Sequence, residues 1–357
     1  MKKPLVTLIL VGVSFLAGYY LRDRLKLSDN IPISLTDRQK SKPLEKYTIE
    51  NLAKTEIKPG KLEIKEILKE ETEYSSYLFE FEFNPNLDGK TLKKVTGQIN
   101  VPSESGAKRF PIIIMLRGYI DQQLFKTGDG TRNASGFFAE RGFITFAPDF
   151  LGYGGSDEET ANIFETRFQT YVTVLSLLET INHLPNSPNI IKISDTISNP
   201  YEVTNKLTNQ LTIYLWGHSN GGQIALTVLE ITGADYPTTL WAPVSKPFPY
   251  SVLYYTDESI DRGKLIRREL SEFEKDYDVE LYSLTNYLDK IIAPLQIQQG
   301  IEDDAVPVTW SNELVDKLKS LDKDVIFNKY PATDHNMHPS WDSVIQRDLE
   351  FFNKYQD

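Results

Sequence analysis

The sequence contains no cysteine and only four histidines. The lack of cysteine excludes disulfide bonds, thiolate zinc sites, iron–sulfur clusters and a cysteine nucleophile. It leaves the redox compartment open, because a cysteine-free chain folds on either side of a membrane. Chemistry that depends on histidine has to use His183, His218, His335 or His338.

Positive charge is also scarce relative to negative charge. The 357 residues include 39 Lys and Arg against 50 Asp and Glu, which gives a net charge of −11. Such a surface repels phosphate backbones, so we expect no nucleic-acid partner. The hydrophobic content of 40% and the charged content of 25% are those of an ordinary globular chain.

One apolar run stands near the N-terminus. Lys2 and Lys3 precede the stretch Leu5 to Leu21, whose length is at the lower limit for a membrane-spanning helix. Residues 1–27 are therefore predicted to be a signal anchor, with a cleaved signal peptide as the first alternative and a buried helix as the second. This predicts a membrane-anchored or secreted protein whose globular part is extracytoplasmic.

A polar stretch follows this segment. Residues 28–61 contain Pro32, Pro43 and Pro59 and few apolar side chains, which is typical of a linker. One short helix is expected near residues 49–53. Residues 62–357 are predicted to form the globular domain.

The globular part begins with a predicted hairpin. Tyr77 to Phe83 alternates apolar and polar residues, as a half-buried strand does. A turn over residues 84–89 separates it from a second strand, Val95 to Val101. Pro111 to Leu116 is continuously apolar, which suits a parallel strand covered on both faces.

Strands and helices then alternate to the end of the chain. Further strands are expected at 143–147, 211–216, 238–242, 295–298 and 325–330, and helices at 160–182, 220–232, 310–321 and 341–354. This order predicts an α/β class protein with a mostly parallel, doubly covered sheet. Residues 247–291 interrupt the alternation and are predicted to be a helical lid insertion.

A nucleophile-elbow pattern lies between one strand and one helix. Gly217-His218-Ser219-Asn220-Gly221 has the spacing Gly-x-Ser-x-Gly. Glycine fits where the turn is too tight for side chains, and the turn raises the Ser219 hydroxyl above the sheet edge. The N–H of Asn220 then points to the position of a developing oxyanion.

A serine nucleophile needs a base, and the base needs an orienting acid. Downstream of Ser219, His335 follows the last predicted strand, and we favour it over His338. Asp303 follows the preceding strand and is the expected acid, before Asp304 and Glu302.

The loop after the strand Pro111 to Leu116 should supply the second oxyanion donor. That loop is Arg117-Gly118-Tyr119, and we expect the N–H of Tyr119 to be the donor. Packing of the Tyr119 ring is an equal alternative reading. For Arg117, an ion pair with an acid such as Asp121 is favoured over a role in binding a substrate carboxylate.

These motifs resemble the α/β-hydrolase fold and, within it, the catalytic domain of the prolyl oligopeptidase family and its single-domain esterase-like relatives. The similarity rests on the elbow, on Gly300-x-x-Asp303-x-x-Val-Pro307 and on Pro148-Asp149 with the glycines after it. It implies a Ser-His-Asp hydrolase without cofactor or metal. Many relatives have His-Gly-Gly where this chain has Arg117-Gly118-Tyr119.

The resemblance leaves the substrate open. Peptidases of the family usually carry a β-propeller. The segment before Leu62 has about 60 residues, which is too few for one. The aromatic start of the insertion, with Phe248, Tyr250, Tyr254 and Tyr255, either lines an acyl pocket or packs on its own domain. We expect a serine hydrolase for small esters, with short peptides as the alternative substrate and a non-catalytic binding module as the remote alternative.

Overall fold

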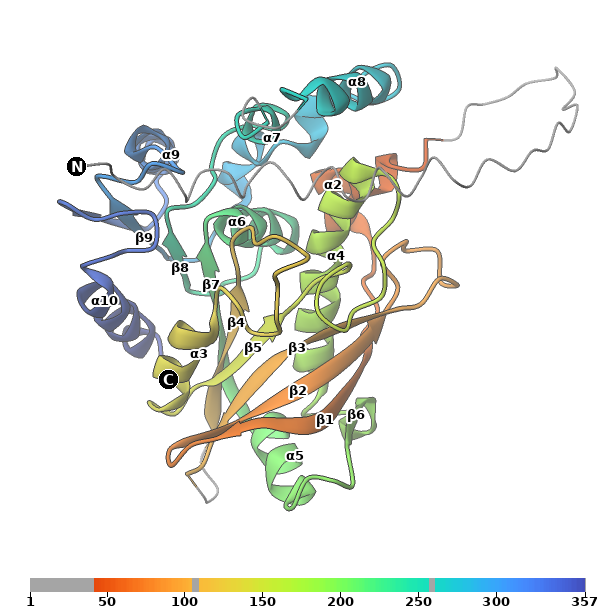
Figure 1. Ribbon diagram of the computed structural model, residues 1–357, viewed down its shortest axis with the longest axis vertical. Coiled ribbons are helices and arrows are strands. Elements are labelled where there is room, and N and C mark those ends of the chain that lie inside the picture. Colours follow the sequence, from red (N-terminus) through yellow and green to blue (C-terminus); the bar gives the residue numbers. More distant parts are fainter. Residues whose placement is uncertain (1–41, 105–108, 257–260, 357) are drawn as a thin grey trace, which may run out of the picture.

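The computed structural model describes residues 42–104, 109–256 and 261–356 (Figure 1). The predicted signal segment 1–27 and residues 28–41 of the predicted linker lie outside this part. No helix of the described residues is long and apolar enough to cross a membrane.

A ten-stranded sheet forms the centre of the described part. Its order is β10-β9-β8-β7-β4-β5-β3-β2-β1-β6. The six strands β10, β9, β8, β7, β4 and β5 run parallel to one another. Beyond β5, the pairs β5/β3, β3/β2 and β2/β1 are antiparallel. The strands are β1 Lys61–Glu70, β2 Tyr74–Phe83, β3 Lys93–Pro102, β4 Phe110–Leu116, β5 Ile144–Pro148, β6 Ile191–Ile193, β7 Gln210–His218, β8 Thr238–Trp241, β9 Leu295–Gly300 and β10 Val325–Tyr330.

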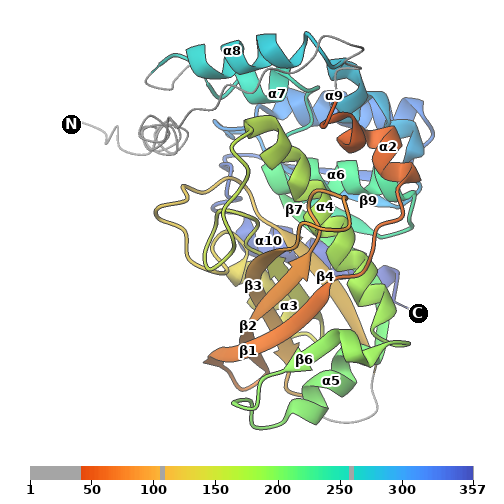
Figure 2. The same ribbon diagram turned by 90° about the vertical axis from the view of Figure 1, so that its right-hand side faces the viewer.

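Helices cover both faces of this sheet. On β4, Ile112 and Ile114 belong to one core, and Ile113 and Met115 belong to the other, because successive side chains of a strand point to opposite faces. The first core includes α4 and α6, and the second includes α3 and α10 (Figure 2). These helices are α3 Arg132–Ala139, α4 Ile163–His183, α6 Asn220–Thr232 and α10 Trp341–Lys354.

The predicted α/β-hydrolase class is therefore confirmed, and every strand and helix predicted from Tyr77 onward outside the insertion is present. Four elements were missed: β1, β6, α3 and α5 (Pro200–Thr208). The second half of β1 is exposed and contains two register shifts opposite β2, so its sequence has no regular alternation. Strand β6 has only three residues.

The N-terminal end of the described part corrects the linker prediction. Tyr47, Ile49 and Leu52 are at most 2% exposed and belong to the larger core. The expected short helix is α2, Ile49–Lys54, which starts at a Thr48 cap that accepts from the N–H of Asn51. These few apolar side chains are enough to pack the segment on the core, because they point to the same side of it. Residues 44–54 therefore belong to the folded domain.

The insertion over residues 247–291 contains α7 (Tyr250–Leu253), α8 (Lys264–Phe273) and three short 3₁₀ helices. Both views place α7 and α8 at the opposite end of the molecule from α5 and β6 (Figures 1 and 2). Phe248 packs edge-on against Phe164 and Phe168 of α4, with ring centroids 5.5 and 5.9 Å away. The start of the insertion is thus anchored on the helix next to the elbow helix.

Packing of α2 against the domain predicts a stability effect. Replacing Leu52 by Ala should lower the free energy of unfolding by about 2–5 kcal/mol, because a buried side chain leaves a cavity. Lys54→Ala is the matched control in the same helix, and it should change stability by less than about 0.5 kcal/mol because Lys54 is exposed. Urea unfolding measures both, and equal values for the two variants would contradict the assigned packing.

Candidate active site

Ser219 lies at the turn between β7 and α6 in a strained conformation. Its backbone has φ 55° and ψ −117°, a region that side-chain-bearing residues seldom adopt. Its N–H donates to the carbonyl of Trp241, 2.8 Å away on β8. A Cβ on Gly221 would lie 1.9 Å from the carbonyl oxygen of Leu116, and one on Gly217 would lie 2.7 Å from that of Gly221. The glycines of the elbow are therefore required by close backbone approach.

The two expected oxyanion donors belong to segments that lie next to Ser219. Asn220 is the first residue of α6, where an N–H has no partner within the helix. Gly118 lies beside the serine, since a Cβ on Gly118 would be 3.1 Å from Ser219 Cβ and 3.6 Å from its Oγ. No main-chain hydrogen bond among the described residues uses the N–H of Tyr119. The structure thus places Gly118, which precedes Tyr119, and the start of α6 beside the turn that carries Ser219.

Asp303 and His335 are in direct contact. Nδ1 of His335 lies 2.9 Å from Oδ2 and 3.0 Å from Oδ1 of Asp303. The two residues follow the neighbouring strands β9 and β10, whose parallel register brings their carboxyl ends together. The carboxylate therefore favours the tautomer with the proton on Nδ1 and leaves Nε2 free to accept one.

The Asp303 carboxylate is held by groups of its own loop. Oδ1 accepts the N–H groups of Ala305 and Val306 at 2.9 and 2.8 Å, and Oδ2 accepts the side-chain amide of Gln299 at 2.9 Å. Asp303 is buried, whereas Asp304 and Glu302 are exposed. Of the three candidate acids, Asp303 alone contacts a histidine among the described residues.

The other histidines occupy different surroundings. His338 is exposed, and its N–H donates to Asp334. His183 ends α4 and lies 3.2 Å from Glu179. Neither of them contacts Asp303.

His218 connects the serine turn to the histidine loop. Its Nε2 lies 2.9 Å from the carbonyl oxygen of His335, and the two imidazole rings are 4.7 Å apart. Burial, together with the neighbouring His335, lowers the pKa of His218 to about 3. The ring is therefore neutral at ordinary pH, and Nε2 donates to the carbonyl. No described hydrogen bond joins Ser219 Oγ to His335, a contact that often tightens only when substrate binds.

The expected ion pair of Arg117 with Asp121 is wrong. Arg117 is only 6% exposed and donates to the carbonyls of Gly118 and Asp149, at 3.0 and 2.8 Å. Its guanidinium lies over aromatic rings, the nearest being Tyr153 at 3.9 Å from the centroid. Tyr153 and Asp149 come from the loop after β5, so the sequence offered no local cue to this arrangement.

A buried carboxylate beneath the site was also missed. Asp348 of α10 accepts the indole N–H groups of Trp216 and Trp241 at 3.2 and 2.6 Å, and the amides of Gln296 and Gln298 at 3.0 and 2.8 Å. Burial raises the pKa of Asp348 to about 7. The four donors come from β7, β8 and β9, so this side chain connects the strands that precede Ser219 and Asp303.

The tyrosines of the insertion lie beside the acid loop. Tyr254 and Tyr255 pack on Trp310, with ring centroids 4.7 and 6.2 Å away, and Trp310 is in α9 (Val308–Ser320), shortly after Asp303. Burial raises the pKa of Tyr255, and the nearby Asp303 raises it further. Phe248 instead packs on α4, so both groups of aromatics pack on the domain, at different places.

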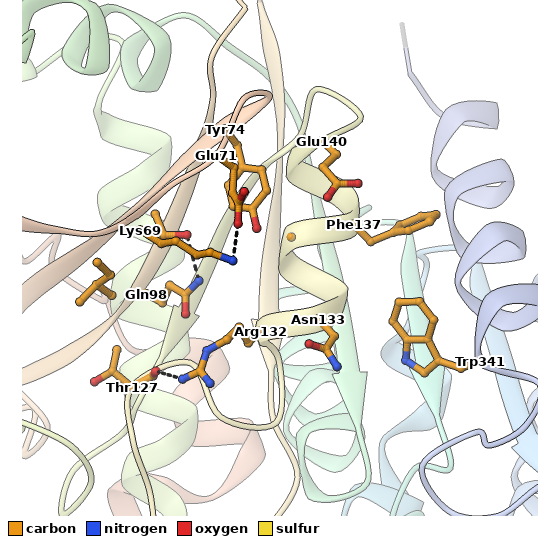
Figure 3. A pocket seen from close by; sticks show the side chains of 13 residues that line it. Lys69, Glu71, Tyr74, Gln98, Thr127, Arg132, Asn133, Phe137, Glu140 and Trp341 are labelled. Atoms are coloured by element: carbon orange, nitrogen blue, oxygen red, sulfur yellow. Dashed lines mark hydrogen bonds and ion pairs between the residues drawn. The ribbon is translucent and has the colours of Figure 1, made fainter.

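A separate cleft of about 600 Å³ lies between the β1–β2 end of the sheet, α3 and the start of α10 (Figure 3). Lys69 pairs with Glu71 there, and Arg132 donates to the carbonyl of Thr127. None of the expected site residues lines this cleft. The described residues contain no cluster of three or more His, Asp or Glu that could hold a metal ion.

Part of the chain matches a known protein family. Residues 198–357, which include Ser219, Asp303 and His335, match the prolyl oligopeptidase family. The chain is 26% identical over 215 residues to an uncharacterised peptidase, YtmA, of Bacillus subtilis, an alignment covering 59% of this chain and 72% of that protein.

Solved structures show the same fold at low sequence identity. An acetyl xylan esterase from a Paenibacillus species superposes with a TM-score of 0.58 at 15% identity, covering 89% of this chain and 96% of that one. An acetyl xylan esterase from a Thermoanaerobacterium species gives a TM-score of 0.56 at 15% identity, covering 99% and 100%. Proteins named as esterases thus share its fold, and a protein named as a peptidase is similar to part of its sequence.

The contacts of the two C-terminal histidines predict unequal effects on activity. His335→Ala should lower kcat by about 10⁴- to 10⁶-fold, the usual loss for a triad member, and Asp303→Asn should also be severe. His338→Ala and Asp304→Asn are the matched controls and should stay within about threefold of the parent. Steady-state hydrolysis of an activated ester measures all four, and a deeper loss in either control would move the assigned role to that residue.

Proposed function

Since the chain is a serine hydrolase of the α/β-hydrolase fold with a prolyl oligopeptidase-type catalytic domain, we propose that it cleaves small, uncharged esters through Ser219, His335 and Asp303. The contact between His335 and Asp303 at the end of the sheet that carries the strained Ser219 supports this assignment. The reaction needs no metal or cofactor.

In the acylation half of the proposed reaction, Nε2 of His335 takes the proton of the Ser219 hydroxyl while Oγ attacks the ester carbonyl carbon. The N–H groups of Asn220 and Tyr119 stabilise the negative charge that develops on the carbonyl oxygen. When the tetrahedral intermediate collapses, His335 gives its proton to the leaving alcohol, and the acyl group stays on Oγ. Asp303 orients the imidazole and stabilises its charged form.

In the second half, water replaces the alcohol. His335 takes a proton from the water, the hydroxide oxygen attacks the acyl carbon, and the bond to Oγ breaks as Ser219 regains its proton. The products are the carboxylic acid and the free enzyme. Water needs no further binding site, so hydrolysis is the simplest outcome of this arrangement.

Aromatic side chains in the oxyanion loop and beside the acid loop support a small, uncharged substrate. Tyr119 belongs to the proposed oxyanion loop, and Tyr254 and Tyr255 pack on Trp310 shortly after Asp303. Tyr119 and Tyr254 are each 39% exposed. Aromatic walls with few polar groups suit an apolar acyl or alcohol group better than a long polar chain.

Cleavage of short peptides is the second candidate function. It is favoured by the match of residues 198–357 to the prolyl oligopeptidase family and by the similarity to a protein named as a peptidase. The same triad and oxyanion donors would serve an amide, so the two functions differ in the substrate groups around the scissile bond.

The cellular location is a further part of the proposal. Lys2 and Lys3 followed by the apolar run Leu5 to Leu21 support a membrane-anchored or exported protein with the hydrolase domain outside the cytoplasm. Protease added to intact cells should therefore degrade the hydrolase domain once any outer layer is permeabilised. Protection of the domain until the cells are lysed would contradict this location.

The preference for esters predicts the outcome of a substrate comparison. The full-length protein should accelerate hydrolysis of short-chain p-nitrophenyl esters more than that of aminoacyl or prolyl p-nitroanilides. Because esters are intrinsically more labile, each rate is divided by its uncatalysed rate. A larger normalised acceleration on the anilides would replace the esterase proposal by the peptidase one.

Ser219→Ala is the control for both substrate classes. It should abolish the activity and the labelling by a fluorophosphonate, which reacts with serines activated by a base and an oxyanion hole. Activity or labelling that persists undiminished would place the chemistry at another residue and reject the proposed site.

A further inference from the structure

Arg117 is a buried cation whose hydrogen bonds go to main-chain carbonyls. Nη1 donates to Gly118 at 3.0 Å and Nη2 to Asp149 at 2.8 Å, while Nε is buried without a partner. The guanidinium carbon lies 3.9 Å from the ring centroid of Tyr153 and 4.7 Å from that of Phe125. None of the ion pairs between described residues includes Arg117, so no carboxylate neutralises it by direct contact.

The hydrogen bond from Arg117 to the Gly118 carbonyl fixes the peptide group between Gly118 and Tyr119. The carbonyl of Gly118 and the N–H of Tyr119 belong to the same planar trans peptide, in which C=O and N–H point in opposite directions. A donor fixed on the carbonyl side therefore fixes the direction of the N–H as well. Gly118 lies beside Ser219, and no described main-chain hydrogen bond uses the N–H of Tyr119.

The charge of Arg117 also changes the strength of that N–H as a donor. A hydrogen bond from a cation is stronger than one from a neutral group, and it polarises the peptide so that the N–H at the other end becomes a better donor. The guanidinium is shielded from water by aromatic rings, so water screens its field weakly, and the buried carboxylate of Asp149 is the acid that acts on it electrostatically without an ion pair. Both effects favour negative charge near the Ser219 hydroxyl.

We propose that Arg117 is a positioning residue that aims and polarises the Tyr119 N–H toward the oxyanion formed at Ser219. This rests on the proposed serine hydrolase reaction, and Arg117 itself touches no substrate. Lysine is a poor replacement, because its single ammonium cannot span two carbonyls and stack on rings as the planar guanidinium does.

The test is Arg117→Met in the full-length protein, which keeps most of the side-chain length and removes the charge and the donors. We expect kcat for a p-nitrophenyl ester to fall about 10²-fold, as when one oxyanion donor is lost, with KM changed less than threefold. Inhibition by a trifluoromethyl ketone, whose adduct with serine carries an oxyanion, should weaken by a similar factor. The kcat of Arg117→Lys should lie between those of Arg117→Met and the parent.

Arg141→Met is the matched control. Arg141 also lies over an aromatic ring, 3.5 Å from the centroid of Phe137, and also donates to a main-chain carbonyl, but on the surface after α3. It should leave kcat and inhibitor affinity within twofold. Circular dichroism and thermal unfolding show whether each variant is folded. If Arg117→Met does not fold, Arg117→Lys is compared with the parent instead.

Two results would overturn the role of Arg117. One is a folded Arg117→Met variant with kcat within threefold of the parent. The other is a fall in kcat with unchanged affinity for the trifluoromethyl ketone, which indicates a general structural effect. Activity that survives Ser219→Ala rejects the proposed function itself, whereas an inactive Ser219→Ala with an unaffected Arg117→Met rejects the Arg117 proposal alone.

Discussion

One buried carboxylate links three strands beneath the candidate active site. Asp348 is fully buried and accepts four N–H groups from Trp216, Trp241, Gln296 and Gln298. Burying a carboxylate is unfavourable, as its raised pKa shows, and the four donors offset that loss. Since these donors stand on β7, β8 and β9, the strand ends that carry the serine turn and the acid loop are held in one relative position.

The loops above this carboxylate are joined to one another as well as to the sheet. The Ser219 N–H is bonded to the carbonyl of Trp241, whose indole reaches Asp348. The ring next to the serine, His218, donates to the main chain of His335. The serine turn and the histidine loop are thus each fixed by main-chain hydrogen bonds to a neighbouring segment.

Much of the fold and of the site could be predicted from the sequence, because both depend on local patterns. The elbow glycines, the apolar strands and the short motif around each of Ser219, Asp303 and His335 are visible within a few residues. The Arg117 cage and the Asp348 network could not be predicted, since their partners are far away in sequence and meet only after folding. The buried face of residues 44–54 was missed because a few apolar side chains in a polar stretch give too weak a signal.

The strain at Ser219 has a consequence for how such a chain can change by mutation. A residue held at φ 55° and ψ −117° destabilises the fold on the order of 1–3 kcal/mol unless it is glycine. Folding stability alone would therefore favour glycine at this position. A Ser219→Gly substitution would stabilise the fold and remove the proposed nucleophile. In the proposed reaction this strained turn presents the Ser219 hydroxyl at the end of the sheet, so folding stability and the proposed chemistry place opposite demands on this residue.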